Sequence, residues 1–277
     1  MGNRGKPKVG CLTANPFKKL KRINTSFMKF PKNLLSLALF AAAVQVACAQ
    51  ESKEITKDLK PFRKVIVSPR VNLILEQGDH EGIRLVYNNV TADKINIKVS
   101  HHTLRVYLDD AKVTERNEYV NSHSRHGIYH NVSITAYVTY KELEHLEIRG
   151  NQELTCTSPL RAEKFVLKAY GENEITLASV KAEYMKTSLY GENKLRIKGG
   201  KAEYQKYKLF GENKIDTQEL KSYSTTANIF GESNLKLNTR DQLKVNAFGE
   251  SQVSYQGDAS VNRGLIFGHA EINKLNN

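Results

Sequence analysis

The stretch LYGENKLRI at 189–197 is preceded by AYGENEI at 169–175 and followed by LFGENKI at 209–215. Weaker copies of the same phrase, IFGESNL at 229–235 and AFGESQV at 247–253, extend the series. Together with one weak copy at each end, the central glycines are Gly150, Gly171, Gly191, Gly211, Gly231, Gly249 and Gly268, which are 21, 20, 20, 20, 18 and 19 residues apart. A period near 20 residues over seven copies predicts an architecture of stacked repeats.

Apolar residues hold fixed places around these glycines. Two residues before the glycine stand Ile148, Ala169, Leu189, Leu209, Ile229, Ala247 and Ile266, and four residues after it stand Leu154, Ile175, Leu195, Ile215, Leu235, Val253 and Ile272. The positions between them are mostly polar, and this period of two is typical of β-strands. The pattern predicts an all-β chain, with about seven coils of a solenoid similar to a parallel β-helix, stacked about 4.8 Å apart.

The glycine itself fits a tight corner with positive φ, which glycine adopts without a steric penalty. Two residues later, Asn173, Asn193 and Asn213 are expected to form a hydrogen-bonded ladder along the stack. Cys156 falls in an apolar column and is interpreted as a small core residue rather than a reactive thiol.

The chain divides into three parts. Residues 1–49 are a signal region, 50–148 are a β-rich portion without the glycine phrase, and 149–277 are the glycine-centred repeats. Short alternating runs fill the middle part, and the polar residues 109–128 are expected to form a surface loop.

The formal charge of +13 is unevenly distributed along the chain. Residues 1–49 contain nine Lys or Arg and no Asp or Glu, which leaves 33 basic and 29 acidic residues elsewhere. The remainder is therefore only slightly basic, and nucleic acid is not expected as a partner.

The basic start precedes an apolar run, Leu34 to Ala49, that ends in Ala47-Cys48-Ala49. This arrangement predicts a secretory signal peptide, with cleavage before Gln50 and export to the periplasm, the outer membrane surface or the medium. The run is shorter than the roughly 20 residues of a transmembrane anchor. Lipidation of Cys48 is an alternative, although Gln45 stands where such signals usually have Leu. Translation from Met28 would leave 1–27 as an extension.

Three further stretches carry a resemblance to a known family. They are FRKVIVSPRVNLILEQGD at 62–79, INIKVSHHTLRVYL at 95–108 and KELEHLEIRG at 141–150, and the glycine-centred repeats follow them. Over about 61–272 the chain resembles the head GIN domain family of auto-transporter adhesins, best known from Bacteroidetes. The resemblance implies a β-helical fold, a cell-envelope or secreted location and an adhesive role whose ligand is not established. This chain differs in placing Glu between the Gly and the Asn, and an aromatic residue before the Gly.

Few residues suggest catalysis or metal binding. His123, His126 and His130 lie in a polar loop near His101 and His102, and are interpreted as solvated rather than as metal ligands. The sequence contains no nucleophile elbow, phosphate loop, zinc-protease helix or dinucleotide fingerprint. We therefore expect a protein without cofactor or metal and without enzymatic activity. The alternatives are a carbohydrate-active enzyme on a β-helix or a purely structural envelope protein.

A glutamate column follows the glycines. Its members are Glu172, Glu192 and Glu212, with Glu232 and Glu250 in the weaker copies. Catalytic carboxylates need unlike surroundings to separate their pKa values, and repeated surroundings do the opposite. Calcium could neutralise the column, but Lys194 and Lys214, two residues after their glutamates, are the preferred explanation.

An aromatic ladder precedes the glycines and consists of Tyr170, Tyr190, Phe210, Phe230 and Phe248, continued by Phe267. If the chain bends at the glycine, these rings close a corner of the core. If the alternation continues, they face outward beside the glutamate column, where they could bind sugar rings or an envelope protein. We expect an exported, adhesin-like binding module of unknown ligand and oligomeric state, with this corner as its candidate site.

Overall fold

The computed structural model describes residues 52–121 and 124–275. The signal region at 1–49, Cys48, Gln50 and His123 lie outside the described residues. The described part of the chain is nearly all β, and it forms a β-solenoid preceded by a β-rich portion, as the sequence predicts. No helix in this part is both long and apolar enough to span a membrane.

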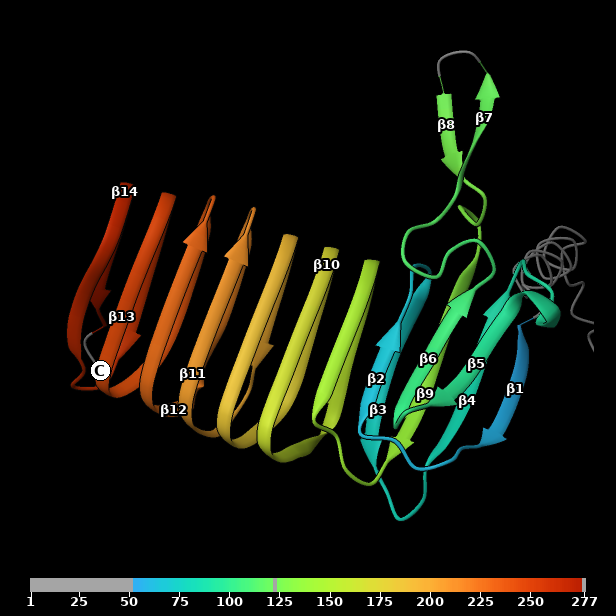
Figure 1. Cartoon of the computed structure of the whole chain (residues 1–277), viewed down its shortest axis with the longest axis horizontal. Helices are drawn as coiled ribbons and strands as arrows, with labels where there is room; N and C mark the ends of the chain where they lie inside the picture. Colours follow the sequence, from blue (N-terminus) through green and yellow to red (C-terminus); the bar gives the residue numbers. More distant parts are fainter. Residues whose placement is uncertain (1–51, 122–123, 276–277) are drawn as a thin grey trace, which may run out of the picture. The chain divides into compact units, whose positions relative to one another are not determined.

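The repeats form five strands that wind around the solenoid (Figure 1). They are β10 (His145–Ile197), β11 (Gly200–Phe210), β12 (Asn213–Phe230), β13 (Ser233–Gln256) and β14 (Ser260–Lys274). Consecutive coils pair in parallel, with Phe210 next to Phe230 and Phe230 next to Phe248. β10 covers 53 residues because its extended backbone continues around the corners.

All seven predicted corner glycines have positive φ, between 92° and 122°. A complete turn needs a corner at each end, so seven corners enclose fewer than seven turns. The solenoid accordingly has about five turns, slightly fewer than the seven coils expected.

The β-rich portion extends the same core. Its elements are β1 (Lys53–Asp58), β2 (Lys64–Val67), β3 (Val71–Gln77), β4 (Gly82–Asn88), η1 (Ala92–Lys94), β5 (Ile95–Ser100), β6 (Thr103–Leu108), β7 (Asn117–Asn121), β8 (Ser124–Gly127) and β9 (Ser133–Tyr140). β2 and β3 form a coil that pairs in parallel with β10 on one side, and with β6 and β9 on the other. Antiparallel β5 and β4 then cover the end, and β1 pairs with β4.

The segment between β6 and β9 was expected to be an irregular loop, but it contains the antiparallel hairpin β7–β8. The residues of both strands are mostly polar and lack alternation, so no strand could be predicted there from the pattern. β6 ends in register with Val67 of β2, which itself pairs with Ile148 of β10. The hairpin therefore leaves the fold at the corner that is aligned with Gly150 (Figure 1).

One continuous hydrophobic core runs through both parts. The apolar positions two before and four after each glycine are buried in nearly every coil. Cys156 is also buried, as expected of a core residue, and it contacts the hydroxyl of Tyr140 at 3.5 Å. Burial raises the pKa of the Cys156 thiol, which disfavours the reactive thiolate. Because the core is shared, the boundary at 148/149 remains a proposed division within one fold.

Candidate binding surface

The aromatic ladder lies on the outside of the solenoid. Its rings, Tyr170, Tyr190, Phe210, Phe230, Phe248 and Phe267, stack one above the next with centroids 4.8–5.2 Å apart and ring planes within 16° of parallel. Phe230 is 38% exposed and Phe267 is 61% exposed. The alternation of inward and outward residues therefore continues through the corner, and the rings do not close the core.

Stacking decides which part of each ring a ligand can reach. The two faces of an inner ring such as Phe210 are covered by the rings of Tyr190 and Phe230. The edges remain, and they form a strip along the solenoid that is apolar at the phenylalanines and carries the hydroxyls of Tyr170 and Tyr190 at one end. A sugar can contact this strip, but it cannot stack on the faces of the inner rings.

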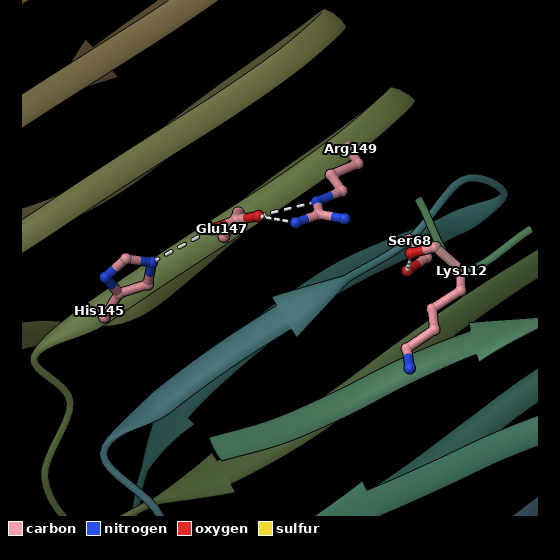
Figure 2. A network of polar contacts seen from close by, with 5 residues as sticks. All are labelled: Ser68, Lys112, His145, Glu147 and Arg149. Atoms are coloured by element: carbon pink, nitrogen blue, oxygen red, sulfur yellow. Dashed lines mark hydrogen bonds and ion pairs between the residues drawn. The ribbon is translucent and has the colours of Figure 1, made fainter. Parts of the chain in front are cut away.

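Arg149 takes the place of a ring at the first corner. Its guanidinium carbon lies 5.8 Å from the centroid of the Tyr170 ring, a distance that allows a cation–π contact. Arg149 Nε donates to Glu147 Oε1 at 2.7 Å, and His145 Nε2 lies 3.4 Å from Glu147 Oε2. Figure 2 shows these three side chains in a row on β10. The ladder therefore ends at the positive charge of Arg149, which is paired with the buried carboxylate of Glu147.

Glu147 is only 5% exposed. Burial opposes its ionisation, but the hydrogen bonds from His145 and Arg149 and the charge of Arg149 outweigh burial and lower the pKa of Glu147 to about 2. Close by, the Ser68 hydroxyl donates to the Lys112 carbonyl oxygen at 2.6 Å (Figure 2). This bond ties the base of the inserted hairpin segment to the end of β2.

An acidic groove of about 720 Å³ runs along the other side of the glycine row. One wall is the glutamate column, Glu172, Glu192, Glu212, Glu232 and Glu250, continued by Asn151 and His269. The opposite wall is formed two residues later by Glu153, Glu174, Lys194, Lys214, Asn234, Gln252 and Glu271. The lining thus contains eight glutamates and two lysines, so the groove carries a net negative charge.

Lys194 and Lys214 line this groove, as the spacing predicts. In the described part of the chain, however, neither lysine lies within ion-pair distance of a glutamate of the column. The expected pairwise neutralisation is therefore not observed, and the column is exposed to water instead. Within residues 52–121 and 124–275, no group of three or more His, Cys, Asp or Glu is arranged to hold a metal ion.

The predicted asparagine ladder lies beneath the groove. Asn173 Nδ2 donates to Asn193 Oδ1 at 2.9 Å, and Asn193 Nδ2 donates to Asn213 Oδ1 at 3.2 Å. All three side chains are buried. Asn173 and Asn213 also donate to the carbonyl oxygens of Tyr170 and Phe210. The ladder thus joins three successive coils and, through Asn173 and Asn213, also ties two of the corners to the strand end that precedes the glycine.

The sequence from 61 to 259 matches the model of the family described as "Putative auto-transporter adhesin, head GIN domain". This chain belongs to the head GIN domain family. No curated protein shows a significant match. The family membership confirms the resemblance seen in the sequence.

Several solved structures share the fold. A "putative adhesin" from Bacteroides fragilis is 15% identical with a TM-score of 0.65, and the match covers 82% of this chain and 98% of that one. A "putative adhesin" from Parabacteroides merdae is 16% identical with a TM-score of 0.60, covering 81% and 96%. A "Putative lipid binding protein" from Parabacteroides distasonis is 14% identical with a TM-score of 0.57, covering 81% and 97%. At such identities the likeness concerns the fold alone.

Proposed function

We propose that this head GIN domain protein is an exported, non-catalytic and adhesin-like module of the cell envelope, which binds its ligand along the glycine corner. The observation that carries the proposal is the strip of six stacked ring edges, four of them phenylalanine and two tyrosine, which continues from coil to coil beside the acidic groove. A largely apolar strip with a polar border is typical of interaction surfaces.

The chemistry of the corner suits a glycan or an envelope protein. The ring edges offer van der Waals contact to a sugar or to an apolar side chain, while the carboxylates of Glu172, Glu192 and Glu212 can accept hydrogen bonds from hydroxyls. The repeated glutamates are in equivalent, exposed positions. This equivalence favours repeated weak contacts along a long ligand over acid–base catalysis at one point.

The binding test replaces Phe210 and Phe230 together by Ser. We expect lower stability, because each stacked pair contributes about 0.5–1.5 kcal/mol. We also expect loss of binding to glycans and envelope proteins extracted from the producing cells. Leu209→Ala is the control, because Leu209 is buried next to Phe210 and its truncation lowers stability without changing the strip. A folded double variant that still binds as the wild type does would remove the ladder from the site.

The proposal that the protein has no catalytic activity is tested by screening neutral and acidic polysaccharides for turnover. Product formation that disappears on replacing Glu192 and Glu212 by Gln would overturn it and favour the carbohydrate-active alternative.

Export is tested by the intact mass of the protein recovered from the envelope. The signal region predicts a chain that starts at Gln50 and carries no lipid. A diacylated chain that starts at Cys48 would contradict this and place the protein on a membrane leaflet.

A further inference from the structure

The strands just before the glycine corner form a flat outer face. Segments 164–170, 184–190, 204–210, 224–230 and 242–248 lie side by side in these coils (Figure 1). In each segment, every second residue points inward to the core and the residues between point outward. The aromatic ladder is the last outward row of this face.

The charges on this face have one sign. Its outward positions contain the six lysines of what we call the lysine face, which are Lys164, Lys168, Lys186, Lys206, Lys208 and Lys244. No Asp or Glu occupies an outward position in the five segments. In the part of the chain that the structure describes, none of the six lysines forms an ion pair. Direct ion pairs therefore do not neutralise the face, and among the described residues the only carboxylate on which one of these charges is seen to act is the buried Glu147, whose pKa Lys168 helps to lower.

The lysines are placed where they repel one another. Lys186 lies directly opposite Lys206 on the neighbouring parallel coil, and Lys208 is one outward position further along the same strand. Like charges opposite each other on neighbouring strands are destabilising, at a cost that a bound anion removes. The arrangement is thus better suited to a bound polyanion than to water alone.

The surroundings direct an anion to this face. The next coil has a carboxylate in line with Lys168, but this is Glu147, which is buried and held by Arg149. Beyond the ladder lies the acidic groove, which repels anions. At the opposite edge, the stacked rings of Tyr184 and Tyr204 are 5.0 Å apart and 52% and 41% exposed, so they add an apolar border with hydroxyl donors.

We propose that the lysine face binds a linear anionic polysaccharide, which lies along the solenoid axis and meets one coil with each sugar. Successive coils are about 4.8 Å apart, which is close to the length of one sugar residue in an extended chain. Among the neutral outward residues, Thr226 is a polar partner for sugar hydroxyls, whereas the amides of Asn228 and Asn246 are hydrogen-bonded to each other at 2.9 Å. This site borders the proposed corner site along the aromatic ladder, and it differs from that site in taking an anionic ligand, because the groove beyond the ladder is acidic.

The same geometry disfavours two other polyanions. A single-stranded nucleic acid gains affinity by stacking its bases on free aromatic faces, but the faces of the inner ladder rings are covered by their neighbours. An anionic membrane needs apolar side chains that insert between lipids. The exposed large apolar residues of the face are ring edges at its borders, and its centre consists of lysines, neutral polar side chains and the half-buried Val166.

The test compares two triple variants of the full chain that remove the same charge. Lys186→Gln, Lys206→Gln and Lys208→Gln change the lysine face, whereas Lys194→Gln, Lys214→Gln and Lys236→Gln change the face after the corner. Binding is measured to heparin and polygalacturonate, with dextran as the neutral probe. We expect the wild type to bind both polyanions, but not dextran, and to bind more weakly as salt rises.

The lysine-face triple should weaken binding to the polyanions by about tenfold or more, since three charge contacts with the ligand are lost. The other triple should bind as the wild type does, and both should show the β-sheet circular dichroism of the wild type and unfold cooperatively. Equal losses from both triples would overturn the proposal in favour of general charge attraction. Equal or tighter binding to phosphatidylglycerol vesicles or oligothymidylate, or no binding to either polyanion, would also overturn it.

Discussion

At each glycine corner, the glycine is subject to two separate steric constraints. The backbone φ is positive, and the neighbouring coil approaches the same point. A Cβ added to Gly191 would lie 2.4 Å from the carbonyl oxygen of Gly171, and one added to Gly211 would lie 2.6 Å from that of Gly191. The alternation and spacing predict the corner, whereas the second constraint follows from how closely the coils stack and could not be predicted from one repeat.

Gly191→Ala and Gly211→Ala are therefore expected to destabilise the fold by at least about 1–3 kcal/mol each, the usual cost of such backbone strain. Gly199→Ala is the matched control, because its added Cβ would meet its nearest neighbour, Ala178 O, only at 3.8 Å. Denaturant midpoints measure the difference. Equal midpoints for Gly191→Ala and Gly199→Ala would contradict the steric explanation of the glycine row.

Glu147 gives the fold a pH dependence with a definite sign. Its pKa falls from an ordinary 4.5 to about 2 on folding. Ionised Glu147 therefore contributes up to about 3 kcal/mol to the free energy of unfolding at pH values above 4.5, and this contribution is lost as the pH falls towards 2. Glu147→Gln should be less stable than the wild type at pH 7 and nearly as stable near pH 2.

Denaturation at the two pH values measures this effect. Glu153→Gln, in the same coil but exposed, is the control and should change stability little at either pH. A constant difference between wild type and Glu147→Gln across the pH range would show that the carboxylate does not titrate as the structure implies.

At the scale of strands and rows of side chains, the sequence predicts which residues line up. It does not predict which parts of these side chains stay exposed to a ligand. The offsets place the rings and the glutamates in two rows, and they predict the asparagine ladder. They leave the orientation of the rings open, because a corner can shift the alternation by one residue. They also do not show that the ring faces are covered, since this depends on the tilt of each ring against the ring in the next coil.

The asparagine ladder is the element that joins neighbouring coils at the corner. Asn193 both accepts from Asn173 and donates to Asn213, so Asn193→Ala leaves the buried Oδ1 of Asn213 without this donor and leaves Asn173 Nδ2 with only its bond to the Tyr170 carbonyl. We expect a loss of about 1–3 kcal/mol in the free energy of unfolding. Asn234→Ala is the control, because Asn234 makes its hydrogen bond to Gln252 on the exposed wall of the groove.

Asn193→Asp distinguishes the hydrogen bonds from simple packing. The carboxylate keeps the shape of the side chain but cannot donate to Asn213, and its burial disfavours the charged form. The variant should therefore be less stable at pH 7 than Asn193→Ala and should regain stability as the pH falls and the carboxyl becomes protonated. A pH-independent Asn193→Asp variant would mean that the ladder is open to water.

At the scale of the whole molecule, the order of the coils differs from their order in the chain. The coil formed by β2 and β3 lies between β10 and the later strands β6 and β9. The repeat phrase is absent from this portion, and its pairings join segments about 80 residues apart in the sequence, such as Leu73 with Leu154. No local pattern encodes such pairings, so the sequence predicts strands there but not their neighbours.

The distribution of charge is also a property of the assembled solenoid. By composition the chain beyond residue 49 is only slightly basic. Coiling places the acidic groove and the lysine face on opposite sides of one aromatic ladder. The position of each charged residue relative to its glycine determines on which side of the ladder the residue lies. The separation of acidic and basic surfaces could therefore be predicted by sorting the charged residues by this offset, but not by counting them.

A solenoid in which each coil contacts only its neighbours should tolerate the removal of one whole coil. Deleting 192–211 joins Gly191 to Glu212 and restores the phrase YGEN, and it leaves every remaining residue at its own offset from a glycine. Tyr190 then stacks on Phe230, and the core columns continue. We expect a folded, cooperatively unfolding protein with the β-sheet circular dichroism of the wild type and a lower denaturant midpoint. Deleting only 192–201 is the control, because it removes half a coil, shifts the following strands out of register and should abolish folding. If both deletions unfold the chain, the coils do not act as interchangeable neighbours, and the stack is stabilised by contacts particular to the coil between Gly191 and Gly211.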